Sequence, residues 1–209
     1  MMKIWGRPAA YNVQKVLWAC DELQLKYENI IAGQHYGINR EPYFLEMNPN
    51  GRVPVIQEQD FILYESNAII RYLWEKYGFL NHAKSLENWA KQDSWMDWTS
   101  ATLYYPFFRD FYLYTTRTPH TEQDPQKIEQ LLSQINPHLS IANQHLSKHD
   151  YIAGSDFSMA DITFGVLVDK WERINIKNQE FIHITNYYEK LLTRSHFIHN
   201  VVHFSLNAI

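Results

Sequence analysis

The chain of 209 residues has only one cysteine, Cys20, and little excess charge of either sign. One cysteine cannot form an intramolecular disulfide or a thiolate-cluster metal site, and it fits a reducing, cytoplasmic setting. No apolar run approaches the roughly 18 residues of a membrane span, and residues 1–7 become polar too early for a signal peptide. A net charge of −4 provides no basic stripe for a nucleic-acid backbone. We therefore expect a cytoplasmic protein with no membrane and no nucleic-acid partner.

Glycine is also scarce, at 7 residues, whereas aromatic residues make up 15% and hydrophobic residues 45% of the chain. This composition predicts a folded, helix-rich protein with aromatic packing and a sizeable core, and it argues against disorder. The length allows one large domain or two small domains.

Two hydrophobic periodicities alternate in residues 1–81. Residues 3–5 form a short apolar segment followed by turn residues, which predicts a strand. Apolar residues then recur at helical spacing over residues 13–23, with Asn12 in the place of an N-cap. Residues 27–31 predict a second strand. This order is typical of a βαβ unit, so we expect the two strands to be parallel.

The following segment predicts a hairpin and another helix. Residues 55–57 and 61–64 flank a short polar stretch, which is typical of two antiparallel strands. Ser66 stands where it would cap a helix that ends before Gly78. A short helix is expected around Phe44, in the connection before the hairpin. The order βαβ and then ββα predicts a small α/β domain with a mixed sheet.

Strand patterns disappear beyond residues 81–84, which mark the expected boundary between domains over residues 1–81 and 85–209. A long helical pattern runs over residues 86–103, and Pro106 is expected to kink or end it. The second domain is therefore predicted to be all helical.

Three later signals mark further helices. Asp124 and Pro125 open a helix that is expected to be interrupted or bent at Pro137. Ser158 and Asp161 have the spacing of a capping box in its acidic form, which predicts another helix start. Two more helical stretches are expected, near residues 187–192 and 198–204.

Val53 and Pro54 directly precede the predicted hairpin. Proline lacks an N–H group, so it is tolerated at the start of a strand. If the bond between the two residues is cis, Val53 could expose its own N–H and C=O groups at the sheet edge and bind an extended peptide as an added strand. An ordinary trans proline that opens a strand is the alternative.

Glu65 and Ser66 lie where a strand passes into a helix. The free N–H groups and the positive dipole end of a helix favour a carboxylate there. Glu65 could pair with an ammonium group beside it, so the two residues suit the zwitterionic end of an α-amino acid. Plain helix capping is the alternative.

The loop from Arg7 to Asn12 joins the first predicted strand to the first predicted helix, at the usual ligand end of an α/β sheet. A thiol bound there would be acidified, because helix N-termini and nearby donors lower a thiol pKa from about 8.5. Tyr11 and Asn12 are the side-chain donors in this loop. Asn12 could act as a mere N-cap, or it could have both roles.

Together these three segments resemble cytosolic glutathione transferases, most of all bacterial theta-like or beta-like members. The resemblance spans essentially the whole chain. It rests on residues 5–16, on Asn-Pro-Asn-Gly-Arg-Val-Pro at 48–54, on residues 65–69, and on the Ser158 and Asp161 box. It implies a thioredoxin-like α/β domain followed by an all-α helical domain, with glutathione as co-substrate.

The resemblance also implies roles for individual residues in the first domain. Val53 would bind the cysteinyl backbone of glutathione beside a cis-Pro54, and Arg52 would lie near the bound peptide. Glu65 and Ser66 would hold the γ-glutamyl end. The implied glutathione-binding residues are Arg7, Asn12, Arg52, Val53, Pro54, Glu65 and Ser66.

One position departs from the family pattern. Theta-like members usually carry an activating serine where this chain has Ala10, and no cysteine stands there either. Cys20 lies deeper along the apolar face of the helix, so we expect it in the core. The resemblance therefore implies that Asn12 stabilises the thiolate, as an asparagine does in some bacterial relatives, with Tyr11 as the alternative.

The electrophile is expected to bind against the helical domain, where aromatic residues such as Tyr104 could wall a pocket. Arg109 and Arg7 suggest tolerance for anionic substrates. Helix packing of the aromatic rings and solvated surface arginines are the alternatives. The implied electrophile pocket consists of Tyr11, Tyr105, Phe108 and Arg109.

His196, His199 and His203 share one face of a predicted helix, and such a spacing could hold zinc. No matching carboxylate motif accompanies them, so a surface or packing role is favoured and no metal is expected.

The resemblance thus implies an enzyme that conjugates the glutathione thiolate to a small hydrophobic or anionic electrophile. It further implies a homodimer with a role in detoxification. A non-catalytic glutathione-fold binding or regulatory protein is the alternative from another class. Glutathione-dependent isomerase, dehalogenase and peroxidase activities stay open within the enzymes.

Overall fold

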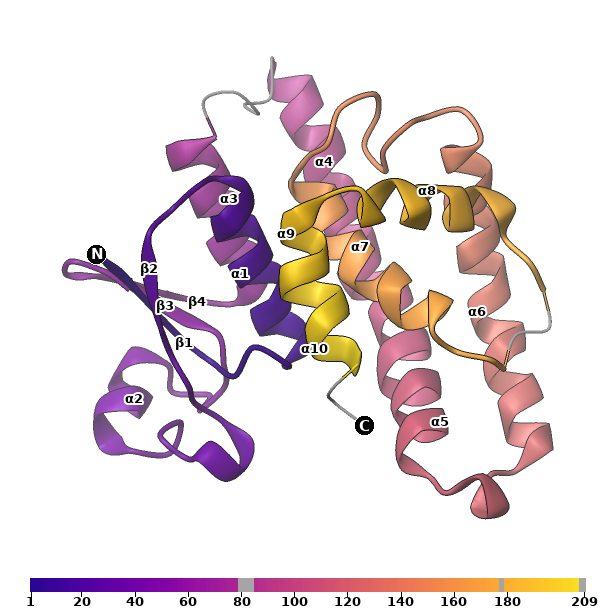
Figure 1. Ribbon diagram of the computed structural model, residues 1–209, viewed down its shortest axis with the longest axis horizontal. Helices are drawn as coiled ribbons and strands as arrows, with labels where there is room; N and C mark the ends of the chain where they lie inside the picture. Colours follow the sequence, from indigo (N-terminus) through magenta and orange to yellow (C-terminus); the bar gives the residue numbers. More distant parts are fainter. Residues whose placement is uncertain (79–84, 177–178, 207–209) are drawn as a thin grey trace. The chain divides into compact units, whose positions relative to one another are not determined.

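The computed structural model describes residues 1–78, 85–176 and 179–206, and its elements are shown in Figure 1. The chain divides into two compact units, and each is described by itself. The first unit contains the N-terminal residues together with the segment from Ser195 onward, and the second contains the helices between them. The domain boundary predicted at residues 81–84 lies outside the described residues.

A four-stranded mixed sheet forms the centre of the first unit, with strand order β2-β1-β3-β4. β1(Met2–Trp5) pairs in parallel with β2(Tyr27–Ile30). β3(Val55–Glu58) is antiparallel to β1 and to β4(Phe61–Tyr64). The predicted βαβ unit and the predicted hairpin are therefore confirmed.

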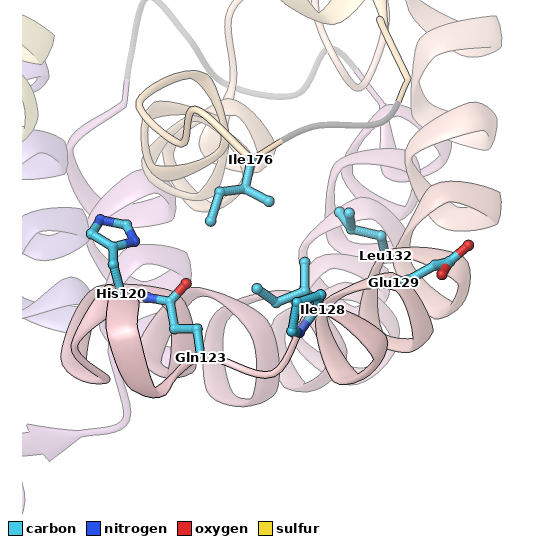
Figure 2. Close-up of a pocket in the computed structure, with 7 residues that line it drawn as sticks. His120, Gln123, Ile128, Glu129, Leu132 and Ile176 are labelled. Carbon is cyan, nitrogen blue, oxygen red and sulfur yellow. The ribbon is translucent and has the colours of Figure 1, made fainter.

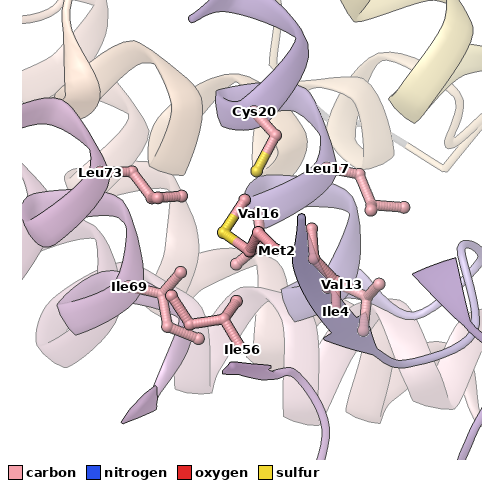
Figure 3. Packing of buried hydrophobic residues seen from close by; sticks show 9 residues of the cluster. All are labelled: Met2, Ile4, Val13, Val16, Leu17, Cys20, Ile56, Ile69 and Leu73. Atoms are coloured by element: carbon pink, nitrogen blue, oxygen red, sulfur yellow. The ribbon is translucent and has the colours of Figure 1, made fainter. Parts of the chain in front are cut away.

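Alternating side chains of the strands face opposite sides of the sheet, and each side is covered differently. α1(Tyr11–Glu22) and α3(Ser66–Tyr77) contribute to the larger core cluster (Figure 3). Trp5 and Val55 belong to a second cluster, which Phe44 of α2(Pro42–Met47) completes. The larger cluster consists of Met2, Ile4, Val13, Val16, Leu17, Cys20, Ile56, Ile69 and Leu73.

Both helix starts near the predicted ligand site differ from the sequence prediction. α1 begins at Tyr11 with Ala10 as its N-cap, so Asn12 lies inside the first turn and does not cap the helix. A turn closed by the Ala10 N–H on the Arg7 carbonyl (3.0 Å) brings the chain into the helix early. α3 is preceded by Glu65 as N-cap, and Ser66 is its first helical residue. Neither cap uses a side-chain hydrogen bond, so backbone geometry sets both starts.

The last described segment, 195–206, packs on α1 within the first unit. It comprises α9(Ser195–Phe197), η4(Ile198–Val202) and α10(His203–Leu206), which confirms the helical prediction there. The Gln14 side-chain amide donates to the Val201 carbonyl (3.2 Å), and Asn200 donates to the Asp21 carboxylate (2.7 Å).

The second unit is all helical, as predicted, but neither internal proline ends its helix. The pattern beginning at Leu86 continues past Pro106 as a π-helix, whose wider turns occur where the regular hydrogen-bond ladder is disturbed. Pro137 lies inside an uninterrupted helix, so the predicted interruption is wrong. The apolar face of that helix buries five aliphatic residues and an alanine, which offsets the lost hydrogen bond. The elements are α4(Leu86–Trp98), η2(Thr99–Tyr112), α5(Leu113–Arg117), η3(His120–Glu122), α6(Pro125–Leu146), α7(Met159–Glu172) and α8(Ile182–Leu192).

The predicted capping box is present at the start of α7. The Ser158 side chain accepts from the Asp161 backbone N–H, and the Asp161 carboxylate accepts from the Ser158 N–H at 2.8 Å. The predicted start at Asp124 is also confirmed, because its carboxylate accepts from the Gln126 N–H (2.9 Å). Within the described residues, no helix combines the length and the apolar character needed to cross a membrane.

Candidate functional site

The end of β1 and the start of α1 approach each other closely at Gly6. A Cβ atom at Gly6 would lie 2.5 Å from Cγ2 of Val13, so only glycine allows α1 this position. The Asn29 side-chain amide donates to the carbonyls of Ile4 (3.0 Å) and Gly6 (2.9 Å) and fixes the chain just before the Arg7 loop. Asn29 was not predicted, because its partners lie more than twenty positions away.

Asn12 and Ser66, predicted from separate segments, meet in the first unit. The Ser66 hydroxyl donates to the Asn12 side-chain oxygen at 3.2 Å, which brings the first turns of α1 and α3 together. Because the side-chain oxygen of Asn12 faces Ser66, its amide nitrogen, which carries two N–H donors, faces away from Ser66. No described protein group accepts a hydrogen bond from that nitrogen. The pair therefore presents a directed N–H donor beside a helix N-terminus.

Tyr11 and Arg7 flank this pair on the same loop and helix start. The Tyr11 side chain is buried, at 8% exposed, and Arg7 is half-buried. Ala10 occupies the position where the family pattern has a serine, and its methyl group packs against the large core cluster. No hydroxyl is available at that position, so the nearest side-chain donors are those of Tyr11 and Asn12.

Lys15 is a buried cation next to the pair that the sequence prediction did not single out. Its ammonium group donates to the Asn67 side-chain oxygen at 2.9 Å and lies 5.3 Å from the centre of the Tyr11 ring. Burial lowers the pKa of Lys15 to about 7; the Glu65 carboxylate opposes this shift and Arg71 adds to it. The signal available in the sequence was a lysine between the apolar helix positions 13 and 16.

The segment before β3 contains a turn closed by the Gly51 N–H on the Asn48 carbonyl (2.9 Å), and it leads to the half-buried Val53. The buried Asn48 side chain donates to the Arg52 carbonyl (2.8 Å). Gly51, within the turn, has a left-handed φ of 59°. The bond between Val53 and Pro54 is cis, in agreement with the resemblance. Among the described residues, none hydrogen-bonds to the N–H or C=O of Val53. This edge can therefore accept an extended peptide backbone.

The two charged residues predicted beside this edge are exposed. Arg52 extends from the turn into solvent. Glu65 is also exposed and has a left-handed φ of 71°, an uncommon conformation for a residue other than glycine. Its position directly before α3 places the carboxylate at the helix start, next to Ser66.

Cys20 lies in the core cluster, as predicted. Its side chain is 0% exposed, and Figure 3 shows it among apolar side chains. Burial, with a contribution from the Asp21 carboxylate, raises the pKa of the Cys20 thiol far above its ordinary value. This thiol is therefore unsuited to act as a nucleophile.

Of the residues predicted for the electrophile, Tyr105, Phe108 and Arg109 lie on η2 in the second unit, whereas Tyr11 lies on α1 in the first unit. Phe108 stacks between Tyr104 and Tyr112, with ring centres 5.3 Å apart on each side. Tyr105 is 61% exposed, and Arg109 is exposed on the same element. The three rings thus form a continuous stack along one side of the helix.

A separate pocket of about 400 Å³ lies among the helices of the second unit (Figure 2). It contains none of the predicted site residues. Its lining consists of His120, Gln123, Pro125, Ile128, Glu129, Leu132 and Ile176. Over the described ranges, no three histidine, cysteine or acidic side chains gather as a metal site.

Comparisons with known proteins agree with this architecture over nearly the whole chain. The family described as "Glutathione S-transferase, N-terminal domain" matches residues 5–84, and "Glutathione S-transferase, C-terminal domain" matches residues 95–195. The Escherichia coli protein named Glutathione S-transferase GstB is 34% identical over 197 residues, covering 93% of this chain and 94% of that protein. Glutathione S-transferase 3 of Zea mays is 28% identical over 174 residues, covering 79% and 76%.

A solved structure is similarly close. The theta class glutathione S-transferase of Xanthomonas axonopodis pv. citri, with glutathione bound, is 35% identical, with 96% of each chain covered and a TM-score of 0.88.

Proposed function

The chain belongs to the glutathione S-transferase family and is a glutathione transferase, and we propose that Asn12 stabilises the glutathione thiolate in its reaction. The hydrogen bond from Ser66 to Asn12 carries this proposal. It joins the site implied for the γ-glutamyl end to the site implied for the thiol, and among the described residues the Asn12 amide nitrogen has no acceptor. The expectation that glutathione is the co-substrate is supported by the glutathione-bound relative from Xanthomonas.

Glutathione binding would use the first unit along a line from α3 to β3. The N–H groups in the first turn of α3, with Ser66, would bind the α-carboxylate of the γ-glutamyl residue, and Glu65 would pair with its ammonium group. The N–H and C=O groups of Val53, which have no hydrogen-bond partner among the described residues, would pair with the cysteinyl backbone beside cis-Pro54, as an added strand does. Arg52 and Arg7 carry positive charge for the free carboxylate of the glycyl end.

The chemical step needs a thiolate. The bound thiol releases its proton to solvent, and the Asn12 amide nitrogen donates a hydrogen bond to the resulting anion. A hydrogen bond to a charged group contributes about 1.5–3 kcal/mol, which corresponds to lowering the thiol pKa by about 1–2 units. The sulfur then attacks carbon of the electrophile. A carbon–sulfur bond forms, and either a leaving group departs with its electron pair or the adduct takes up a proton.

The electrophile side of the reaction is proposed from η2. The exposed Tyr105 and the stack that contains Phe108 offer apolar surface, and Arg109 offers charge for an anionic group. A small hydrophobic or anionic electrophile fits this set of side chains.

We further propose a cytoplasmic homodimer with a role in detoxification. The single, buried Cys20 suits a reducing compartment. β4 is an edge strand, and Ile62 (38% exposed) and Tyr64 (37% exposed) share one of its faces, which a second copy could cover. Light scattering at several concentrations measures the mass and tests the dimer directly.

The assignment of Asn12 is tested by comparing Asn12→Ala with Tyr11→Phe. We expect Asn12→Ala to raise the pKa of bound glutathione by about 1–2 units and to lower kcat/KM by about 10–100-fold. Tyr11→Phe should shift the pKa of bound glutathione by less than about 0.5 unit and change kcat/KM by less than about three-fold. The pKa is read from the ultraviolet absorbance of the thiolate during a pH titration, and the rates from a panel of electrophiles. Asn175→Ala, at an exposed position, is the matched control.

Each result has a distinct meaning. A raised pKa in Tyr11→Phe alone would assign the role to Tyr11. Binding of glutathione by the wild-type chain without turnover of any electrophile class would favour the non-catalytic binding protein, an alternative to which Ala10 in place of the family serine gives some support. No binding of glutathione by the wild-type chain would refute the proposed function.

A further inference from the structure

Lys15 occupies an unusual place for a lysine. Its side chain is 3% exposed, and the residue lies on α1 one helical turn after Tyr11 and Asn12. Residues three and four positions apart share a helix face, so Lys15 continues the face that carries both thiol-site candidates. Its only described hydrogen bond crosses to α3, where it ends on Asn67.

Burying an ammonium group costs free energy because the charge loses its hydration, and the groups around Lys15 offset this cost only in part. Removal from water disfavours the charged form and is the largest influence on the pKa of Lys15. The groups that face it are Glu65, which favours the cation, Arg71, which disfavours it, and the neutral Asn67 and Tyr11. Close packing of α1 on α3 alone would be served at lower cost by an apolar side chain. The charge therefore suggests a role in ligand binding.

We propose that Lys15 is a positioning residue for glutathione: through Asn67 it holds the first turn of α3 against the first turn of α1, and its charge favours an anion at the start of α3. This inference rests on the proposed function. It follows from the chain of contacts from Lys15 to Asn67 (2.9 Å) and from the neighbouring Ser66 back to Asn12 (3.2 Å). Both hydrogen bonds join the first part of α1 to the first turn of α3, so loss of the bond from Lys15 to Asn67 weakens the positioning of Ser66 against Asn12.

The charge of Lys15 can be tested because its ammonium group titrates near neutral pH, where binding is readily measured. Lys15 loses its proton as the pH rises through about 7, which removes a positive charge from the site of the α-carboxylate. The wild-type chain should therefore bind the tripeptide more weakly above this pH than below it. An arginine at this position stays charged throughout, and a methionine is never charged.

The experiment uses S-methylglutathione as the probe, since its blocked sulfur cannot titrate, and measures its dissociation constant by calorimetry from about pH 6 to about pH 8. We expect the wild-type affinity to fall across this range and Lys15→Arg to bind without pH dependence. Lys15→Met should bind about ten-fold more weakly at the acidic end, the effect of a unit charge acting over about 10 Å in partly buried surroundings. Lys26→Met, at an exposed position, should behave as wild type.

Folding and binding are separated by melting curves of each variant. Lys15→Met should melt no lower than wild type, because it removes a desolvated charge. Equal affinity and equal pH dependence in the wild type, Lys15→Arg and Lys15→Met would overturn the inference while leaving the proposed function intact. If Lys15→Met does not fold, persistence of the wild-type pH dependence in Lys15→Arg overturns it. A wild-type chain that binds neither S-methylglutathione nor glutathione refutes the proposed function itself.

Discussion

Asp161 offers a sharp test of how buried polar groups stabilise the second unit. The residue is 0% exposed at the start of α7, and four hydrogen bonds converge on its carboxylate. One oxygen accepts from the Ile152 N–H (2.9 Å) and the Tyr187 hydroxyl (2.9 Å). The other accepts from the Ser158 N–H (2.8 Å) and the Ser158 hydroxyl (3.0 Å). The carboxylate thus ties the preceding loop, α7 and α8 together.

The substitution Asp161→Asn keeps the shape of the side chain and removes half of its acceptors. The amide oxygen can still accept from Ile152 and Tyr187, but the amide nitrogen would face the buried Ser158 N–H, and two donors would then oppose each other. The Ser158 hydroxyl can rotate and accept, so one backbone donor remains unsatisfied. A buried donor without an acceptor costs about 1–3 kcal/mol, so we expect the free energy of unfolding to fall by about 2 kcal/mol.

The loss should lower the melting temperature by about 4–8 °C, given a shift of about 2–4 °C per kcal/mol for a chain of this size. Calorimetry and urea denaturation followed by circular dichroism measure both quantities. Asp156→Asn, at an exposed position in the same loop, is the matched control and should change the melting temperature by less than about 2 °C. Equal melting temperatures for Asp161→Asn and wild type would show that the network contributes little and would refute the reasoning.

Three further predictions concern the first unit. Cys20 should resist alkylation in the native protein and react only on unfolding, and Cys20→Ala should leave glutathione binding unchanged; rapid modification of the folded chain would contradict its placement in the core. Glu65→Ala should weaken glutathione binding by about ten-fold and leave the thiol pKa unaltered, because one charge pair is lost. Calorimetry measures the affinity, and an affinity equal to that of wild type would contradict the prediction. Burial alone would raise the pKa of Glu58, but hydrogen bonds from a lysine and two tyrosines lower it to about 2. The ionised Glu58 carboxylate therefore contributes its full stabilisation above about pH 5, and this stabilisation is lost as the pH falls towards 2. When the melting temperature is measured across this pH range, Glu58→Gln should show a smaller decrease than wild type.

Local patterns in the sequence predicted the elements of the first unit well. The strands and the hairpin followed from short apolar runs bounded by turn residues, and their pairing followed from the length of the connections.

Two predictions from local sequence were wrong. Proline usually breaks a helix, but burial of the apolar face along the rest of α6 outweighs this effect, so the helix continues through Pro137. The N-cap predicted at Asn12 was wrong because a backbone turn before Ala10 had already started the helix.

The candidate site could be predicted only in part, for a physical reason. Each of its segments has a recognisable local sequence, but its geometry depends on hydrogen bonds between distant positions. Ser66 and Asn12 are 54 positions apart, and Lys15 and Asn67 are 52 positions apart. Periodicity and spacing carry no information about which polar side chains meet across two helices. Lys15 was missed for this reason, and Asn29 was missed because its partners, the backbone carbonyls of Ile4 and Gly6, lie on another strand and its following loop.

The packing of the last helices on α1 has a consequence for biosynthesis. The amide of Gln14 and the ring of Trp18 meet partners at Val201 and Phe197, which leave the ribosome only after the helices of the second unit have been made. A nascent chain that has emerged only as far as β4 and α3 would expose this face of α1. The N-terminal unit is therefore completed only after translation of the helices that interrupt it.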